Sequence, residues 1–155
     1  METRETVLRI IRNAPVVVLS TINDAGYPES RALLNLANEK QYPTLADKLL
    51  QDSGPLTVYF STNTSSSKVA QVRANPRSAL YYCLPETYHG VWLSGDIEVV
   101  TDQEEKDRFW VEGWEVYYPK GRTDEDYCLL RMAAARMRLY RKLSVTELDG
   151  AGLRA

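Results

Sequence analysis

The stretch LTVYFSTNTSSSKVAQVRANP, residues 56–76, joins a strand, a polar loop and a helix in direct succession. Apolar and polar residues alternate over 56–61, which predicts a half-buried strand. The loop over 62–68 reads Thr-Asn-Thr-Ser-Ser-Ser-Lys. Apolar residues then recur at helical spacing until Asn75, where Pro76 disfavours the helical conformation of the residue before it. The stretch therefore predicts a strand that leads through a polar loop into a short helix.

This loop has the chemistry of an anion site. Free backbone N–H groups at a helix start favour a negative charge, and phosphate is the natural ligand. The hydroxyl groups of Ser66 and Ser67 can donate hydrogen bonds, Lys68 adds a point charge, and Arg31 on another strand offers a planar fork for two oxygens. An ordinary helix cap and turn is the more frequent explanation of such a loop, so from the residues alone both interpretations stay open.

Upstream, the pattern predicts a leading helix and a β-hairpin. Apolar residues at helical spacing indicate a helix over 3–13, which Pro15 ends. A β-branched strand over 16–22 and an extended segment over 28–36 flank an Asn-Asp-Ala-Gly turn. In the second strand, the period of two places Ala32, Leu34 and Leu36 on one apolar face, so Arg31 is expected to point away from that face. A short helix is expected over 44–53.

Downstream, two apolar runs predict strands over 79–84 and 91–100, with Gly95 as a candidate bulge. Thr101 and Glu104 have the spacing of a capping box, which predicts a helix over 102–112. A last strand is expected over 128–141. Short antiparallel strands with a few helices at the edges indicate a mainly β (α+β), barrel-like fold, and a doubly wound parallel sheet is disfavoured.

Composition limits the function classes. The chain has 155 residues, 44% of them hydrophobic, which suits one domain over 1–155. The net charge of -2 gives no global field for nucleic acid or an anionic membrane. No apolar run is long enough to cross a bilayer, so a cytoplasmic location is expected. Cys83 and Cys128 are expected to be buried thiols, and His89 has no second imidazole, so no metal site is predicted.

Several motifs resemble those of one family. The run Tyr59-Phe60-Ser61-Thr62-Asn63, with Ser66, Lys68 and Asn75-Pro76, resembles the flavin loop of pyridoxamine-phosphate-oxidase-like proteins. Residues 28–34 resemble the family strand whose arginine contacts the flavin phosphate. Residues 91–95 resemble the strand that follows the flavin loop in the same family. The segment Tyr118-Pro119-Lys120-Gly121 is most similar to the general stress protein branch. The resemblance implies an antiparallel split β-barrel with a few peripheral helices.

The resemblance also assigns roles at a flavin mononucleotide (FMN) site. It implies that Ser67 and Lys68 hold the phosphate together with Arg31, that Ser61 and Thr62 line the pyrimidine edge of the flavin, and that the backbone after the arginine runs along the isoalloxazine ring. The expected cofactor-binding residues are Arg31, Ala32, Leu33, Ser61, Thr62, Ser66, Ser67 and Lys68.

Two departures from the family pattern bear on the activity. Vitamin-processing members usually have an arginine where this chain has Ser67, so the phosphate cluster lacks one cation. Residues 148–155 lack the basic, histidine-containing substrate motif, so oxidation of pyridoxamine phosphate itself is not expected.

The leading interpretation is a homodimeric, FMN-dependent oxidoreductase that acts on a small redox substrate, with no protein acid or base indicated. The alternative is a non-catalytic flavin or haem carrier or sensor in the stress response, and deazaflavin or haem stays open in place of FMN. A third hypothesis rests on the basic residues between Arg131 and Lys142. Arg136 and Arg138 share one strand face, as in a solvated strand, so nucleic-acid binding is not expected.

Overall fold

The computed structural model describes residues 2–49 and 55–150. Within these ranges the chain forms eight strands, four α-helices and two 3-10 turns. The elements are α1 (Glu2–Asn13), β1 (Val16–Ile22), β2 (Pro28–Leu34), α2 (Pro43–Leu49), β3 (Thr57–Asn63), α3 (Ser67–Ala74), β4 (Arg77–Leu84), β5 (His89–Val100), α4 (Gln103–Arg108), η1 (Trp114–Val116), η2 (Gly121–Thr123), β6 (Tyr127–Ala133), β7 (Arg136–Arg141) and β8 (Ser144–Asp149). None of these helices is long and apolar enough to cross a membrane.

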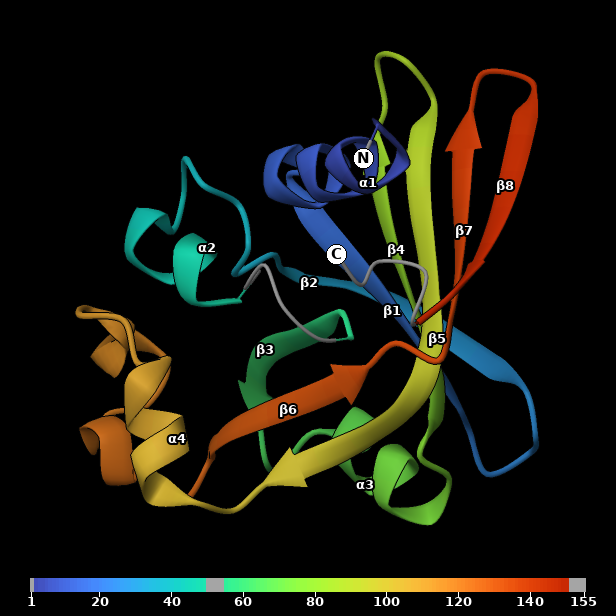
Figure 1. Cartoon of the computed structure of the whole chain (residues 1–155). Coiled ribbons are helices and arrows are strands. Elements are labelled where there is room, and N and C mark those ends of the chain that lie inside the picture. Colours follow the sequence, from blue (N-terminus) through green and yellow to red (C-terminus); the bar gives the residue numbers. More distant parts are fainter. Residues whose placement is uncertain (1, 50–54, 151–155) are drawn as a thin grey trace.

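The strands form one antiparallel sheet in the order β2-β1-β4-β5-β6-β3, and β7 and β8 branch from β5. The long strand β5 pairs with β4 and β7 through its first part and with β6 through its last residues. It therefore passes from one half of the barrel to the other, and the sheet curls into a half-barrel (Figure 1). The expected mainly β, antiparallel split barrel with peripheral helices is confirmed.

Gly95 lies where β5 changes partners, and it is not a bulge. The β4–β5 register runs without interruption from Arg77–Asp96 to Leu84–His89. A side chain at position 95 would instead come within 2.6 Å of the carbonyl oxygen of Ala133, at the end of β6. Glycine is needed there because another backbone approaches closely, not because the ladder has an extra residue.

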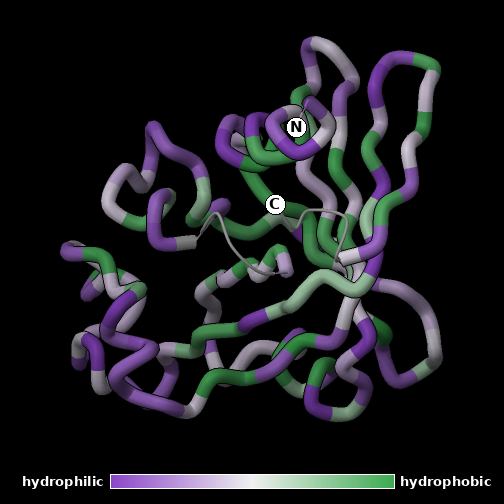
Figure 2. Tube along the Cα trace, in the orientation of Figure 1, coloured by the Kyte–Doolittle hydropathy of each residue, from purple (hydrophilic) through white to green (hydrophobic). Residues whose placement is uncertain are grey.

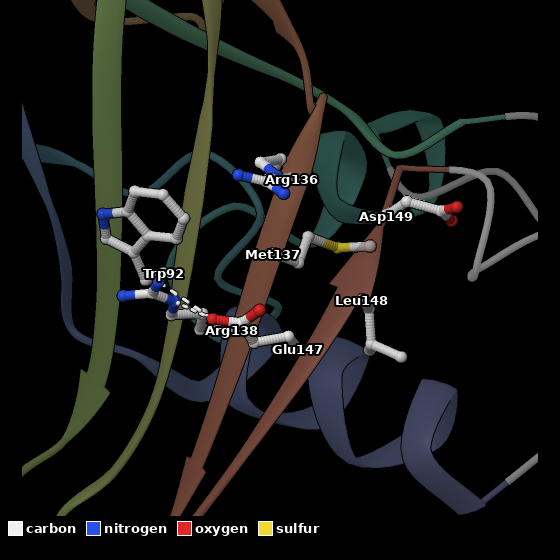
Figure 3. A pocket seen from close by; sticks show the side chains of 7 residues that line it. All are labelled: Trp92, Arg136, Met137, Arg138, Glu147, Leu148 and Asp149. Atoms are coloured by element: carbon white, nitrogen blue, oxygen red, sulfur yellow. Dashed lines mark hydrogen bonds and ion pairs between the residues drawn. The ribbon is translucent and has the colours of Figure 1, made fainter.

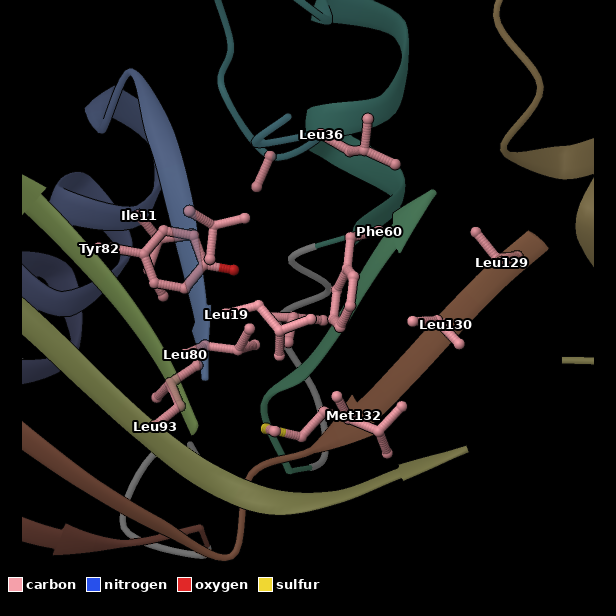
Figure 4. Packing of buried hydrophobic residues seen from close by; sticks show 14 of the residues in the cluster. Ile11, Leu19, Leu36, Phe60, Leu80, Tyr82, Leu93, Leu129, Leu130 and Met132 are labelled. Carbon is pink, nitrogen blue, oxygen red and sulfur yellow. The ribbon is translucent and has the colours of Figure 1, made fainter. Parts of the chain in front are cut away.

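The core fills the space between the sheet and α1. The buried face of α1 carries Val7, Ile10 and Ile11, as the helical spacing predicted. Figure 4 shows part of this core, with Ile11 of α1 near the strands and Phe60 of β3 between Leu19 of β1 and Leu130 of β6. Figure 2 shows that apolar residues concentrate on the strands, whereas the connections are largely polar. Each fully buried Leu, Ile or Phe contributes about 1.5–3 kcal/mol.

Two asparagines hold the carboxyl end of α1. The side-chain amide of Asn35 donates to the carbonyl oxygens of Ile11 (2.7 Å) and Ala14 (2.9 Å). Asn38 donates to the same Ala14 oxygen at 3.0 Å. Both residues are buried, and they satisfy carbonyl groups that a helix end leaves without partners. This contact explains why β2 ends at Leu34 and not at the expected position 36.

The helix expected over 102–112 is shorter, because α4 ends at Arg108. Asp102, and not Thr101, is the N-cap, and its side chain accepts a hydrogen bond from the Glu104 amide. Beyond the helix, turns at Phe109 and Trp110 bury both aromatic side chains. The burial of these two rings prevails over the helical propensity of the segment.

The strand expected over 128–141 is two strands with a break. Ala134 and Ala135 interrupt it, because their amides donate to Leu56, just before β3, and to Ser94 on β5. Strand β6 pairs with β3 and with the end of β5, whereas β7 pairs with the first part of β5 and with β8, a strand that was not predicted. The helix expected over 44–53 corresponds to α2, and its predicted end lies outside the described residues.

Candidate functional site

An open groove of about 340 Å³ lies between strand β2 and the end of strand β3. A volume of this size suits a small-molecule site. Five of the eight residues expected to bind a cofactor line it: Ala32, Leu33, Ser61, Thr62 and Lys68. The other lining residues are Val16, Leu34, Asn63, Tyr117 and Tyr118.

The polar end of the groove is built from β3 and the first turn of α3. Ser61 and Thr62 are buried at the end of the strand. The Lys68 ammonium donates to the hydroxyl oxygen of Thr62 at 2.8 Å. The side chain of Tyr118 donates to the backbone carbonyl of the same threonine at 2.9 Å. The strand end is therefore fixed on both sides, and the lysine is held over the groove.

Asp126 pins the loop that connects β3 to α3. Its carboxylate accepts from the Asn63 side-chain amide at 2.6 Å and from the Ser65 backbone amide at 2.8 Å. The Asn63 hydrogen bond, followed by that of Ser65, lowers the pKa of Asp126. Sequence reasoning missed this residue, because it lies 61 positions after Ser65 and belongs to no motif.

The start of α3 has unused hydrogen-bonding capacity. Ser66 is the N-cap residue in an extended conformation, but its side chain makes no cap hydrogen bond. Among the described residues its hydroxyl oxygen is buried and has no partner. The Ser67 and Lys68 amides belong to the first helical turn, where backbone N–H groups have no intrahelical acceptor. A ligand with several oxygen acceptors fits these donors.

The position of Arg31 corrects the expected orientation of its strand. In the β1–β2 register Arg31 pairs with Leu19, which is buried, so Arg31 shares the inner face of the sheet. Ala32 and Leu34 are exposed instead. Strand β2 has apolar residues on both faces, so periodicity alone could not identify the inner one. At α3 this inner face is polar, and the Arg31 guanidinium donates hydrogen bonds there to Gln71 of α3 and Thr21 of β1.

The charges of Arg31 and Lys68 act on one another, and Glu29 pairs with Arg31 at 3.3 Å. Burial, followed by repulsion from the nearby Arg31 guanidinium, lowers the pKa of Lys68. Two cations from different elements thus lie close enough to destabilise one another. An anion bound between them would relieve this repulsion and would gain charge-assisted hydrogen bonds. Among the described residues no cluster of three or more His, Cys, Asp or Glu side chains can hold a metal ion.

Aromatic side chains form one wall of the groove. Tyr118 is buried, and its ring packs near Trp110, Trp114 and Tyr127, with ring centroids 5.1–6.4 Å apart. Tyr117, its neighbour in sequence, is 56% exposed at the mouth of the groove. Sequence reasoning had used Tyr118 only as a subfamily marker and missed both tyrosines as lining residues.

The basic stretch near the carboxyl end is largely ion-paired. Arg131 contacts Glu98 and Glu105, and Arg138 contacts Glu147 at 2.9 Å. Arg138 also lies over the Trp92 ring in a shallow hollow of about 170 Å³ beside β7 and β8 (Figure 3). Acidic residues on neighbouring elements thus neutralise part of the charge on which the nucleic-acid hypothesis rested.

Comparison with solved structures places this fold among general stress proteins. A protein related to general stress protein 26, of the pyridoxinephosphate oxidase family, from Clostridium acetobutylicum is 26% identical with a TM-score of 0.79. That match covers 98% of this chain and 97% of the other. General stress protein 26 from Bacillus anthracis is 17% identical with a TM-score of 0.71, over 96% and 100% of the two chains. A heme binding protein from Mycobacterium smegmatis shares the fold at 13% identity and a TM-score of 0.69, over 97% of this chain and 59% of that one.

Sequence comparison gives the family directly. A curated pyridoxine/pyridoxamine 5'-phosphate oxidase from Microcystis aeruginosa is 27% identical over 99 residues, which make up 64% of this chain and 39% of that enzyme. The family model described as pyridoxamine 5'-phosphate oxidase matches residues 3–141. Because this match spans the strands, the loop and the helix that build the groove, the chain belongs to the pyridoxamine 5'-phosphate oxidase family.

Proposed function

We propose that this protein binds FMN in the groove between β2 and β3 and uses it for redox chemistry on a small molecule, as a cytoplasmic member of the general stress protein branch. One observation carries the proposal. The hydroxyl of Ser66, the N-cap residue of α3, is buried and unpartnered among the described residues, and Lys68 follows two positions later in the first turn of the helix. Arg31 is near enough to shift the pKa of that lysine. A phosphate monoester would supply the acceptor that Ser66 lacks and a second negative charge for Arg31, which already pairs with Glu29, and for Lys68.

Each residue has a distinct task in this proposal. Ser66, Ser67 and Lys68 would donate hydrogen bonds to the phosphate from the first turn of α3, and Arg31 would approach it from β2. The hydroxyls of Ser61 and Thr62 lie at the strand end, where they would meet the polar edge of the ring. The backbone of Ala32 and Leu33 would run along its face. The bound flavin would supply the transfer of hydride or electrons.

The site has one cation fewer than the family pattern provides, because Ser67 stands where an arginine is usual. Electrostatic attraction to the phosphate dianion is correspondingly weaker, and hydrogen bonds from Ser67 replace only part of it. We therefore expect FMN to bind measurably more tightly in the Ser67→Arg variant than in the wild type.

We also propose that the protein is a homodimer whose second copy covers the groove. Apolar side chains surround its mouth in an exposed state: Val16 is 40% exposed, Leu34 37% and Tyr117 56%. An exposed apolar rim around a binding groove is typical of a protein–protein contact. Sedimentation equilibrium tests this: a dimer that Leu34→Glu dissociates supports the proposal, and a monomeric wild type contradicts it.

A non-catalytic flavin carrier or sensor is the second candidate. The described residues that line the groove include no histidine, cysteine, aspartate or glutamate. Lys68 and Tyr118 can also transfer protons, but both are already hydrogen-bonded to Thr62, which favours a binding role for them over catalysis. Haem or deazaflavin in the same groove would fit a carrier as well.

The first experiment is the absorbance spectrum of the purified protein, followed by titration with FMN. Trp110 and Trp114 pack near Tyr118 in the groove wall, so bound flavin should quench tryptophan fluorescence. Saturable quenching with a flavin spectrum supports the proposed site, and a colourless protein indifferent to FMN contradicts it. Steady oxidation of NAD(P)H by the loaded protein separates the oxidoreductase from the carrier.

A further inference from the structure

Gln71 links the two elements that would hold the flavin phosphate. It lies on α3, one helical turn after Ser67, and its side chain points toward β1 and β2. Only 9% of the residue is exposed. A buried glutamine must find partners for both its carbonyl and its amino group, because an unsatisfied polar group inside a protein is costly.

Gln71 makes three side-chain hydrogen bonds, one with Arg31 and two with groups that also contact Arg31. The carbonyl oxygen of Gln71 accepts from the Arg31 guanidinium at 3.2 Å and from the Thr21 hydroxyl at 2.5 Å. Its amino group donates to the Glu29 carboxylate at 3.1 Å. Hydrogen bonds from Gln71, followed by those from Asn23, lower the pKa of Glu29.

Thr21 closes the network. It is fully buried, and its hydroxyl oxygen accepts from Arg31 at 2.6 Å while its proton goes to Gln71. Glu29 meets the other guanidinium nitrogen at 3.3 Å. Arg31 is thus held from three sides by β1, β2 and α3.

Holding the guanidinium in place has a direct effect on binding. A free arginine loses considerable rotamer freedom when it clamps a ligand, whereas a side chain that is already ordered loses little. Glutamine suits this task because it accepts from the arginine and donates to the carboxylate at once. Glutamate has no proton to donate, and leucine can do neither.

We propose that Gln71 is a positioning residue that orients Arg31 for the phosphate, and that it thereby sets the preference of the site for FMN over riboflavin. The inference rests on the proposed function. Gln71 would not touch the flavin, since it acts through Arg31. Its contribution should therefore fall on the phosphate alone and not on the ring.

The test compares FMN and riboflavin affinities of the wild type and of Gln71→Leu, together with thermal unfolding of each protein. Gln103→Leu is the matched control, because Gln103 also makes two side-chain hydrogen bonds but lies on α4, outside the groove. We expect Gln71→Leu to lose roughly tenfold in FMN affinity, as for a weakened hydrogen bond to a charged group, with less than about a twofold change for riboflavin. The control should keep the wild-type ratio.

A second pair of variants, at Thr21, tests the inference if Gln71→Leu does not fold. Thr21→Val removes the hydroxyl at almost constant shape, and Thr21→Ser retains it. Loss of FMN preference in the valine variant alone supports the inference. The inference is overturned if the wild type prefers FMN over riboflavin and Gln71→Leu or Thr21→Val keeps that preference. The proposed function is not contradicted by this result. A wild type without any preference for FMN overturns both.

Discussion

Replacement of Asn35 by alanine tests how the sheet edge beside the groove is fixed. Asn35 is 1% exposed and directly follows the strand that carries Arg31, Ala32 and Leu33. Its amide makes two hydrogen bonds to the end of α1, and its carbonyl oxygen accepts from the Ala37 backbone at 3.1 Å. Without this side chain the Ile11 carbonyl and the Ala37 amide lose the hydrogen bond from Asn35, and the Ala14 carbonyl keeps only the bond from Asn38.

The magnitude follows from these contacts. Each lost hydrogen bond costs about 1 kcal/mol on average, so the variant should lose about 3 kcal/mol of the free energy of unfolding. In a chain of this length that corresponds to a fall of roughly 6–12 °C in Tm. Circular dichroism during thermal and urea unfolding measures both quantities.

Asn13→Ala is the matched control. Asn13 also donates its side-chain amide to an α1 carbonyl, that of Arg9 at 2.9 Å, but in an exposed position. Water replaces this bond, so the control should change the free energy of unfolding by less than about 0.5 kcal/mol. A difference between the two variants of under about 1 kcal/mol would refute the reasoning that buried hydrogen bonds anchor this edge.

Three further outcomes are expected. Tyr118→Phe keeps the ring but removes the bond to the Thr62 carbonyl; unfolding in urea should show a loss of about 1 kcal/mol. Since burial raises the pKa of Tyr118 to about 12, the loss should not vary between pH 6 and pH 9 in that experiment. Arg131→Met leaves two acidic side chains on β5 and α4 without their cation, at a cost of about 2 kcal/mol in the same assay. Hydrogen bonds hold the pKa of Asp126 below its ordinary value of 3.8, so the stability that this carboxylate contributes is present above pH 3.8 and is lost as the pH falls through its pKa in the folded protein. When unfolding is measured against pH, the Asp126→Asn variant should lack this acid-dependent loss of stability.

The alkaline limit of FMN binding provides a pH test of Lys68. Burial and Arg31 lower its pKa in the free protein. The ammonium is charged only below that pKa, so FMN affinity should fall as the pH rises toward 10.5, earlier than for an exposed lysine. In Lys68→Met this phase should disappear from a titration followed by tryptophan fluorescence. A wild-type affinity that stays constant to pH 10 would speak against a role for this charge.

Half of the ten groove-lining residues were expected from the sequence, because they lie in two short segments, 32–33 and 61–68, that resemble family motifs. The polar loop before a helix indicated Lys68 from the residues alone, whereas the resemblance to the family added Ser61 and Thr62 at the end of β3. The orientation of Arg31 was wrong, since β2 has apolar residues on both faces and packing against α3 selects the inner one. No local pattern marks Gln71, because its partner Thr21 is 50 positions away and both are ordinary polar residues.

Tertiary packing also decides the elements that differ most from expectation. The segment after Arg108 has helical propensity, but burial of Phe109 and Trp110 requires turns. The break at Ala134 arises because the Ala134 amide donates to Leu56, just before β3, and the next amide donates to Ser94 on β5. Contacts between residues far apart in the sequence decide these element boundaries, so a prediction from about ten neighbouring residues cannot find them.

The measurement that tests the central claim most directly is equilibrium titration of the flavin-free protein with FMN, for the wild type and for Arg31→Ala combined with Lys68→Ala. The matched control is the double variant Arg9→Ala and Lys142→Ala. It also removes one arginine and one lysine, but from a surface hollow between α1 and the turn that joins β7 to β8. We predict that the first variant loses at least about a hundredfold in FMN affinity, as two charged hydrogen bonds require, while the control stays within about threefold of the wild type. Equal FMN affinity in all three proteins would contradict the phosphate site at the start of α3.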